Sequence, residues 1–204
     1  DKLIRAITML KLEKAELYHS NLIKWEYKIN KTSLLKKSYK QTKFDYLFEG
    51  GSAGCTYVFT KDFRDLIIKN IESFDSRNYS SFSHDWYFYF FARVNNLKVF
   101  SDSAALIMYR IHGNNLHGHM NAISFQAIKK RVEYLRSGWY FNHIKYLDQL
   151  LKDGSLEKEI YLKYKKNIFS RLSVTLRHNF KLIRSNRKFI LFLIASLISK
   201  KDNV

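Results

Sequence analysis

The fold class is indicated by the first 25 residues, DKLIRAITMLKLEKAELYHSNLIKW. Apolar residues recur there at helical spacing, namely Leu3, Ile4, Ile7 and Leu10. This period predicts a helix over residues 2–14, and the pattern of residues 15–25 predicts an extended strand directly after it. A helix followed by a strand is the order of elements typical of an α/β fold.

The next stretches alternate between irregular and periodic segments. Residues 26–49 are polar and lysine-rich without a clear period, which predicts an excursion over the surface. Gly50, Gly51 and Gly54 then interrupt the chain. The β-branched and aromatic run at 55–60 predicts a short strand, after which a helix can start at 61–62.

The second half of the chain is predicted to be mainly helical. Ser83 is the predicted N-cap of an aromatic helix over residues 84–95. Two short strands are predicted, over residues 98–100 and 105–110. Beyond Met120 the helical pattern continues almost to the end, with breaks expected at Gly138 and Gly154.

Composition limits the classes of function. The net charge of +18 indicates an anionic partner. That partner could be nucleic acid, an acidic membrane surface or a phosphorylated substrate. Residues 121–204 hold 18 lysines and arginines against 6 aspartates and glutamates, so most of this charge lies in the last part of the chain. A single cysteine, Cys55, excludes an internal disulfide framework and a cysteine-based zinc site. No signal-peptide pattern is present and no apolar run approaches the roughly 20 residues of a membrane span, so we expect a cytoplasmic protein.

Three places carry chemistry, and each has an ordinary structural explanation. The glycines at 50–54 suit close approach of a ligand to the backbone, or an ordinary loop. Asp85, between His84 and Trp86, is predicted to lie in the first turn of a helix. An ionised carboxylate there suits a general base, but the helix dipole also favours an aspartate at that position for structural reasons alone. In the segment Tyr-Arg-Ile-His-Gly-Asn-Asn at 109–115, Arg110 suits a phosphate and His112 a metal, or the segment is a turn with a packed histidine.

These pieces occur in a characteristic order. Gly-Cys-Thr at 54–56, His-Asp-Trp at 84–86 and Tyr-Arg-x-His-Gly-Asn-Asn at 109–115 together resemble the second half of the catalytic domain of family 2 glycosyltransferases. The rhamnosyltransferase-like branch that builds bacterial surface polysaccharides is the most similar. Residues 1–3 and 15–21 also resemble the stretch that follows the Asp-x-Asp motif of that family.

The resemblance implies a fold, a reaction and a set of roles. Residues 1–120 would form the acceptor-side half of a GT-A (nucleotide-diphospho-sugar transferase) domain, and residues 121–204 a helical basic region. Asp85 would be the catalytic base of an inverting transfer from a nucleotide sugar, such as a rhamnose donor, to a saccharide or lipid-linked acceptor. The residues implied to contact the acceptor are His84, Trp86, Gly54, Cys55 and Thr56. Arg110 and His112 would lie at the donor diphosphate, with His112 also near its divalent metal.

The sequence departs from the family in one respect. The Asp-x-Asp motif, which would hold Mn²⁺ or Mg²⁺, is not present in this chain. The resemblance would place it before Asp1, with the donor-binding half. We therefore expect the cofactor to be a divalent metal bound through residues outside these 204.

The C-terminal region joins basic residues to the apolar run FILFLIASLI at 189–198. Ten apolar residues are too few to span a bilayer but suit an anchor lying on an anionic membrane surface, on the inner face of the cell membrane. A terminal helix packed on the domain or on a second copy of the chain is the alternative. The alternatives to the whole assignment are a non-catalytic membrane-surface assembly protein and a basic nucleic-acid-binding module. No nucleic-acid motif is present, so nucleic acid is not the expected partner.

Overall fold

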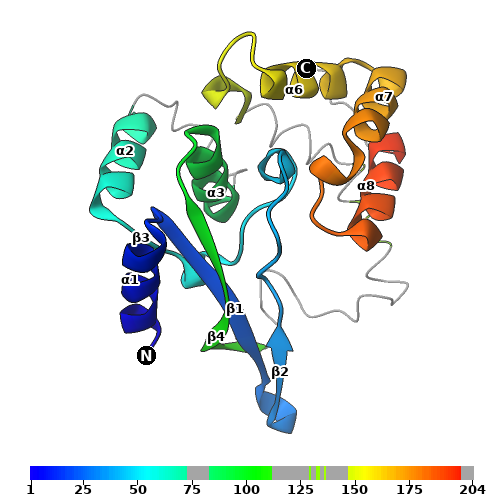
Figure 1. Ribbon diagram of the computed structural model, residues 1–204. Helices are drawn as coiled ribbons and strands as arrows, with labels where there is room; N and C mark the ends of the chain where they lie inside the picture. The colour runs from blue at the N-terminus through cyan, green and yellow to red at the C-terminus, as the bar shows by residue number, and fades with distance from the viewer. Residues whose placement is uncertain (73–82, 112–128, 130–131, 134–135, 137–146, 199–204) are drawn as a thin grey trace. The chain divides into compact units, whose positions relative to one another are not determined.

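The computed structural model describes residues 1–72, 83–111, 129, 132–133, 136 and 147–198 (Figure 1). The chain forms two compact units. The first comprises residues 1–40, 50–77 and 83–120, and the second comprises residues 41–49, 78–82 and 121–204.

The first unit combines helices with a mixed sheet. Its helices are α1 (Lys2–Glu13), α2 (Lys61–Glu72) and α3 (His84–Val94). Its strands are β1 (Leu17–Glu26), β2 (Lys31–Leu35), β3 (Val58–Phe59) and β4 (Val99–Ile111). Two 3₁₀ turns, at Tyr27–Ile29 and Gly54–Thr56, precede β2 and β3. This mixed α/β architecture agrees with the α/β class predicted from the sequence.

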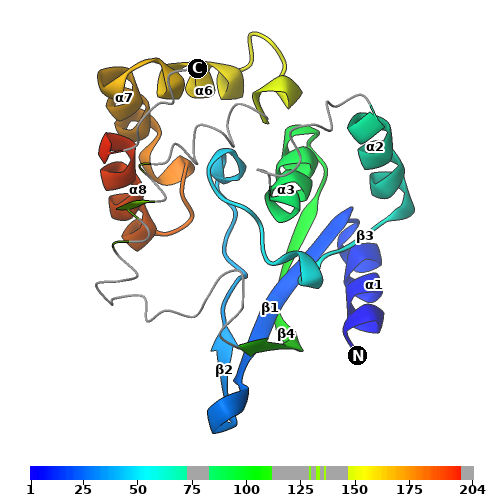
Figure 2. The ribbon, with the colours of Figure 1, turned by 180° about the vertical axis from the view of Figure 1, so that it is seen from behind.

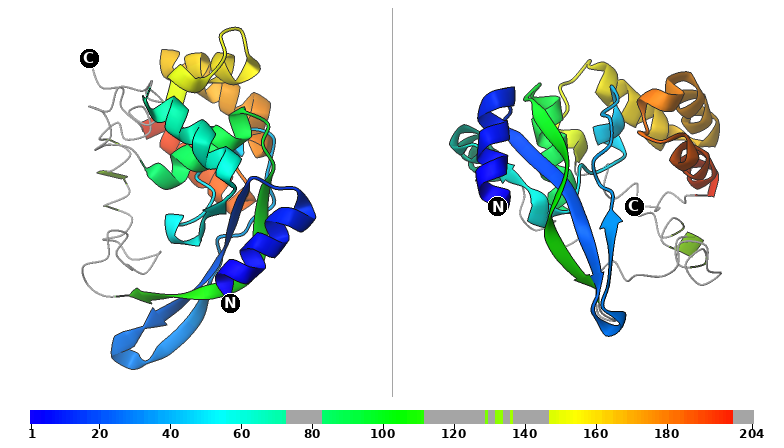
Figure 3. Two further views of the ribbon diagram at one scale, coloured as in Figure 1. Left: turned by 90° about the vertical axis from the view of Figure 1, so that its left-hand side faces the viewer. Right: turned by 60° about the horizontal axis from the view of Figure 1, so that its bottom comes forward.

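Strand β1 is the centre of the sheet. It pairs in parallel with β4 and antiparallel with β2 and β3. Leu17 is opposite both Val99 and Phe59, and because a strand has only two edges, β4 lies on one edge of β1 and β3 on the other. The long β1–β4 pair is visible from both sides of the molecule (Figures 1 and 2), and Figure 3 shows β1 between β4 and β2.

Helix α1 and strand β1 confirm the prediction made from the first 25 residues. The side chain of Asp1 caps α1 by accepting from the Leu3 backbone N, and Lys14 ends the helix in the left-handed conformation. Ala6 and Leu10 are buried against Tyr18 in a small core beneath the helix. Of the four apolar residues whose spacing predicted the helix, Leu10 is buried, whereas Leu3, Ile4 and Ile7 are exposed, so the spacing identified the helix but not its buried face.

Strand β4 corrects one prediction. The sequence predicted two short strands, whereas Val99–Ile111 is a single strand. The polar residues at 101–103 interrupt the apolar pattern, but Asp102 is buried and hydrogen-bonded. Register shifts opposite residues 20–23 of β1 absorb the irregularity.

The second unit is helical. It contains α6 (Leu156–Lys166), α7 (Ile168–His178) and α8 (Asn186–Ile198), with 3₁₀ turns at Asp45–Leu47, Asp148–Leu150 and Asn179–Lys181. Gly154 adopts a φ of 76° before α6, which confirms the predicted break there, whereas Gly138 lies outside the described residues. Along the part of the chain that the structure describes, no helix combines the length and apolar character needed to cross a bilayer.

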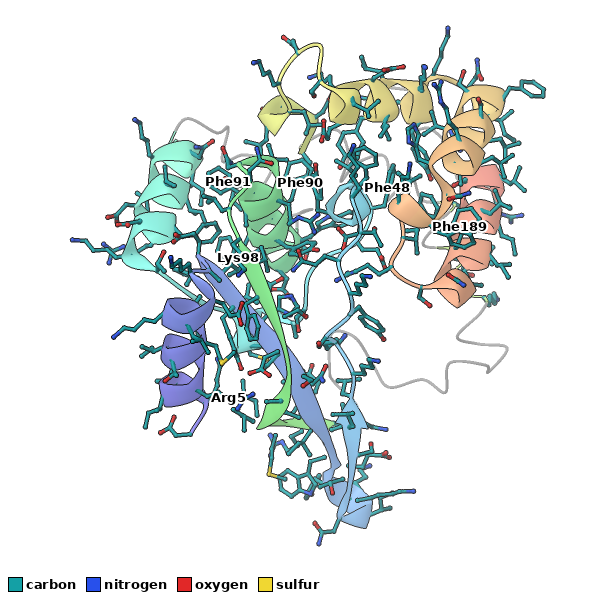
Figure 4. The ribbon with its side chains drawn as sticks, viewed as in Figure 1. Arg5, Phe48, Phe90, Phe91, Lys98 and Phe189 are labelled. Carbon is teal, nitrogen blue, oxygen red and sulfur yellow. The ribbon has the colours of Figure 1, made fainter. Side chains whose placement is uncertain are left out.

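Residues 44–48 correct a second prediction. The sequence placed them in a surface excursion, but Phe44, Tyr46, Leu47 and Phe48 are buried. Phe48, labelled in Figure 4, packs against Tyr161, Tyr164 and Phe192 of the helical unit. Their burial depends on helices that follow more than a hundred residues later in the chain. The local sequence pattern of residues 44–48 therefore could not predict that these side chains are buried.

Candidate active site

The candidate site is centred on the start of α3. Asp85 is in the first turn of this helix, where the helix dipole stabilises a negative charge. His84 Nε2 lies 2.5 Å from Asp85 Oδ1, and the exposed fractions of the two side chains are 71% and 25%. Asp85 Oδ1 itself is closed to solvent, and its polar contact is with His84 Nε2. The exposed quarter of the Asp85 side chain therefore does not include Oδ1.

Gly54 faces this pair of side chains. A Cβ at position 54 would overlap Asp85 Oδ1 and lie 2.7 Å from His84 Nε2. Gly51 is similarly close to α3, since a Cβ there would lie 2.8 Å from the Tyr89 ring. Both glycines are explained by close packing of the loop against α3. This packing places the backbone of the loop beside the Asp85 carboxylate.

The phenol of Tyr57 ties the loop to the helix. Its hydroxyl accepts from the Ser52 backbone N at 3.0 Å and donates to the Asp85 backbone O at 2.9 Å. The Ser52 hydroxyl in turn donates to the Ser20 backbone O of β1 at 3.0 Å. One hydrogen-bonded chain thus fixes the first turn of α3 to the central strand.

Cys55 and Lys2 lie on the outer side of the same turn. Lys2 Nζ donates to the Cys55 backbone O at 2.9 Å. Partial desolvation lowers the pKa of Lys2 and raises the pKa of the Cys55 thiol, so the thiol is protonated at neutral pH. The Lys2 contact anchors the turn that carries Gly54 and Cys55 to the start of α1.

The other two residues predicted to contact an acceptor are buried. Trp86 is 4% exposed, and a Cβ at position 50 would lie 3.5 Å from it. Thr56 is fully buried, and its hydroxyl donates to the Ala53 backbone O at 2.7 Å. The structure thus gathers Gly54, Cys55, His84 and Asp85 near one another, with Thr56 and Trp86 in the layer beneath. Their roles toward an acceptor stay predictions.

Arg110 lies elsewhere on the sheet. It is exposed near the end of β4, opposite Trp25 of β1. Trp25 is five residues along β1 from Ser20, which corresponds to about 17 Å at the usual rise of a strand. His112 falls outside the described residues. Among the residues that the structure describes, no group of three histidine, cysteine or acidic side chains is arranged to hold a metal ion.

Sequence reasoning missed Tyr57 and Lys2. Tyr57 was counted only as an aromatic residue of a predicted strand, and nothing local shows that its hydroxyl reaches a helix that begins 27 residues later. Lys2 was counted only within the predicted first helix. A hydroxyl-bearing aromatic close to a Gly-Gly-Ser-x-Gly loop is the one sequence signal that points toward a contact of the Tyr57 kind.

The sequence was compared with family models, curated proteins and solved structures. No family model matches the chain, and no solved structure matches it. The chain is 36% identical over 159 residues to a curated protein described as "dTDP-rhamnosyl transferase RfbG" from Shigella flexneri. That match covers 76% of this chain and 53% of the relative, so the chain spans about half of the relative's length. The similarity supports a relationship between this chain and the glycosyltransferases.

Proposed function

We propose that this chain is the acceptor-side part of an inverting glycosyltransferase. It would transfer a sugar, rhamnose by analogy with the relative, from a nucleotide donor to a saccharide or lipid-linked acceptor. The 36% identity to a rhamnosyl transferase supports the reaction class. The family 2 assignment and the GT-A fold belong to the same proposal.

The observation that carries the role of Asp85 is its placement. Asp85 projects from the first turn of α3, Oδ1 is enclosed by Gly54 and His84, and part of the side chain reaches solvent. A carboxylate held in this way has few conformations to lose when it meets a hydroxyl. That pre-organisation is what general-base catalysis requires.

The proposed step is a direct displacement. The acceptor oxygen forms a bond to the anomeric carbon while the bond from that carbon to the donor phosphate breaks. The electron pair leaves with the nucleoside diphosphate, and the acceptor proton passes to the Asp85 carboxylate. Attack opposite the leaving group inverts the anomeric centre.

A divalent metal, Mn²⁺ or Mg²⁺, belongs to this proposal through an Asp-x-Asp motif outside the chain. The described residues do not make a metal site by themselves. Arg110 and His112 are proposed to meet the donor diphosphate, with His112 near the metal.

The test compares two first-turn aspartates of one unit. Asp85→Asn and Asp62→Asn each remove a carboxylate from the start of a helix, α3 and α2 respectively. Both are made in a protein that joins this chain to the region expected before Asp1. Transfer from dTDP-rhamnose and binding of that donor are measured separately.

We expect Asp85→Asn to lower kcat by at least about 100-fold with donor binding retained, since general bases contribute 10²- to 10⁴-fold. Asp62→Asn should keep kcat within about threefold of the wild-type value. An exposed charge at a helix start stabilises the helix by well under 1.4 kcal/mol, the free energy that corresponds to a tenfold change in rate. Equal losses in both variants would show that Asp85 acts only through its helix. Full activity of Asp85→Asn would remove it from the reaction.

A further inference from the structure

Helix α8 has one face fixed inside the second unit. Phe192 stacks on Tyr164 with ring centroids 5.9 Å apart and also packs on Phe48. Ser196 is buried, its hydroxyl is 3.1 Å from the Tyr164 hydroxyl, and its backbone O accepts from Arg171 at 2.8 Å. These contacts fix the rotation of α8 about its own axis.

The opposite face of α8 is apolar and exposed. We call it the α8 face, and its members are Ile190, Leu191, Ile194 and Leu197, which are 61%, 61%, 48% and 43% exposed. Their spacing places them on one side of the helix, away from Phe192 and Ser196. Next to the start of α8, Phe180 is 51% exposed and packs on Phe189, with ring centroids 5.3 Å apart. Figure 4 labels Phe189 on α8.

The stretch of sequence that contains this face is strongly basic. Residues 160–201 contain 11 lysines and arginines and no aspartate or glutamate. Lys181, directly after Phe180, is exposed, as is Arg177 on the preceding helix. The acidic Asp45 and Glu49, by contrast, are engaged by the buried Arg184 at 3.3 Å. An exposed apolar helix face thus lies within a long stretch that is exclusively basic.

We propose that the α8 face docks on the surface of an anionic lipid bilayer. The apolar side chains enter the boundary between headgroups and acyl chains while the basic residues contact the anionic headgroups. The helix has 13 residues, about 20 Å at 1.5 Å per residue, so it lies along the surface and does not cross the bilayer. This docking goes beyond the proposed transfer reaction and does not depend on it.

Charge complementarity selects this partner over two others. Nucleic acid would satisfy the basic residues but would leave four large aliphatic side chains in water. A second copy of the chain would cover those side chains but would bring two strongly basic regions together, and their like charges repel. An anionic bilayer satisfies both the apolar and the basic groups.

The test uses the chain as it is and a matched pair of variants. Ile190→Glu places a negative charge on the α8 face, and Ile4→Glu makes the same change at an isoleucine that is 67% exposed on α1 of the other unit. Co-sedimentation is measured with vesicles of phosphatidylcholine alone and with vesicles that contain phosphatidylglycerol. Circular dichroism checks that each variant is folded, and Leu191→Gln repeats the test on the α8 face without a new charge.

We expect the wild-type chain to bind the anionic vesicles at least about tenfold more tightly than the neutral ones, since each nearby basic residue adds roughly fivefold. Binding should fall steeply with added salt. Ile190→Glu should weaken binding about tenfold or more, and Ile4→Glu less than about threefold, because only the first enters the lipid boundary. Equal effects of the two variants would overturn the proposal. Loss of self-association in Ile190→Glu, with vesicle binding unchanged, would instead assign the α8 face to a second copy.

Discussion

At the scale of single residues, the candidate site depends on glycine at position 54, which has no side chain. Gly54 leaves room for the Asp85 carboxylate and the His84 ring to approach the loop backbone. The atoms that a Cβ would meet are the ends of two side chains, and such ends can rotate away. A larger residue at position 54 therefore displaces Asp85 and His84 while the backbone remains in place.

Gly54→Ala should separate activity from stability. We expect transfer by the longer protein to fall at least about tenfold, because a displacement near 1 Å at a reacting group costs up to 10²-fold. Its melting temperature should stay within a few degrees, since Gly→Ala at a compatible backbone position is worth only about 0.4–1 kcal/mol.

The matched control for this variant is Gly50→Ala, whose Cβ would make ordinary contacts of 3.5 Å with Trp86. It should retain activity. A large drop in melting temperature for Gly54→Ala would show that Gly54 serves the fold instead of the site.

At the scale of elements, helix α1 and strands β1 and β4 are joined by hydrogen bonds to the carboxylate of Asp102. Asp102 of β4 accepts from Arg5 Nε of α1 at 2.7 Å and from the Tyr18 hydroxyl of β1 at 2.9 Å. Burial, followed by the contact with Asp102, raises the pKa of Tyr18 to about 12. Burial alone would raise the pKa of Asp102 as well, but the hydrogen bonds from Arg5, the Ala104 backbone and Tyr18 together lower it.

Asp102→Asn should therefore change how stability depends on pH. A folded-state pKa below the unfolded value of about 3.9 means that the carboxylate stabilises the fold above that pH, and that this contribution is lost as pH falls through the folded pKa. At pH 7 the variant should lose about 1–3 kcal/mol of unfolding free energy, and the gap from the wild-type protein should narrow below about pH 4. Urea unfolding between pH 7 and pH 3 measures both effects.

The exposed pair of Glu13 and Lys98 provides the control for Asp102→Asn (Figure 4 labels Lys98). Glu13→Gln should change the unfolding free energy by less than about 1 kcal/mol, because exposed ion pairs contribute little. A gap that is constant across pH for Asp102→Asn would contradict the lowered pKa.

Elements also show how far the sequence could predict this fold. Helix α1 and strand β1 follow from the local sequence pattern and the start of α3 from Ser83 at its N-cap position, and the structure confirms these positions, although the Ser83 side chain makes no capping hydrogen bond. Strand β4 was divided in two because Asp102 is polar, and its partners Arg5 and Tyr18 are more than 80 residues away. In the same way, His84 and Asp85 were singled out from their helix-start position, whereas the contribution of Tyr57 required the loop and the helix to be placed together.

At the scale of the whole molecule, the two units have separate cores. The first is built on β1 and α3, with Tyr18, Phe63 and Phe90 fully buried, and the second on Phe48 and the helices α6, α7 and α8. A cavity in one core removes contacts from that core alone. Damage to the two units should therefore be distinguishable.

Phe192→Ala and Phe90→Ala provide this test. Each deletes a buried aromatic side chain, and such deletions cost about 3–5 kcal/mol. We expect Phe192→Ala to speed amide hydrogen exchange in α6, α7 and α8 and to leave β1 and α3 nearly unchanged, with the reverse pattern for Phe90→Ala. Faster exchange throughout the chain in both variants would instead mean that the two units unfold as one.

The path of the chain between the units has a consequence for how the protein is made. Residues 41–49 leave the ribosome more than a hundred residues before α6, α7 and α8, the helices of the unit to which they belong. At about 5–20 residues per second, Phe48 waits roughly 7–30 s for Phe192 to be synthesised. Until Tyr161 and Tyr164 of α6 have been made, Phe48 and its aromatic neighbours at residues 44–46 have none of the partners that Phe48 packs against in the folded unit. Exposed aromatic surface on an incomplete chain favours aggregation, and here it would be covered only in steps, first as α6 and then as α8 is translated.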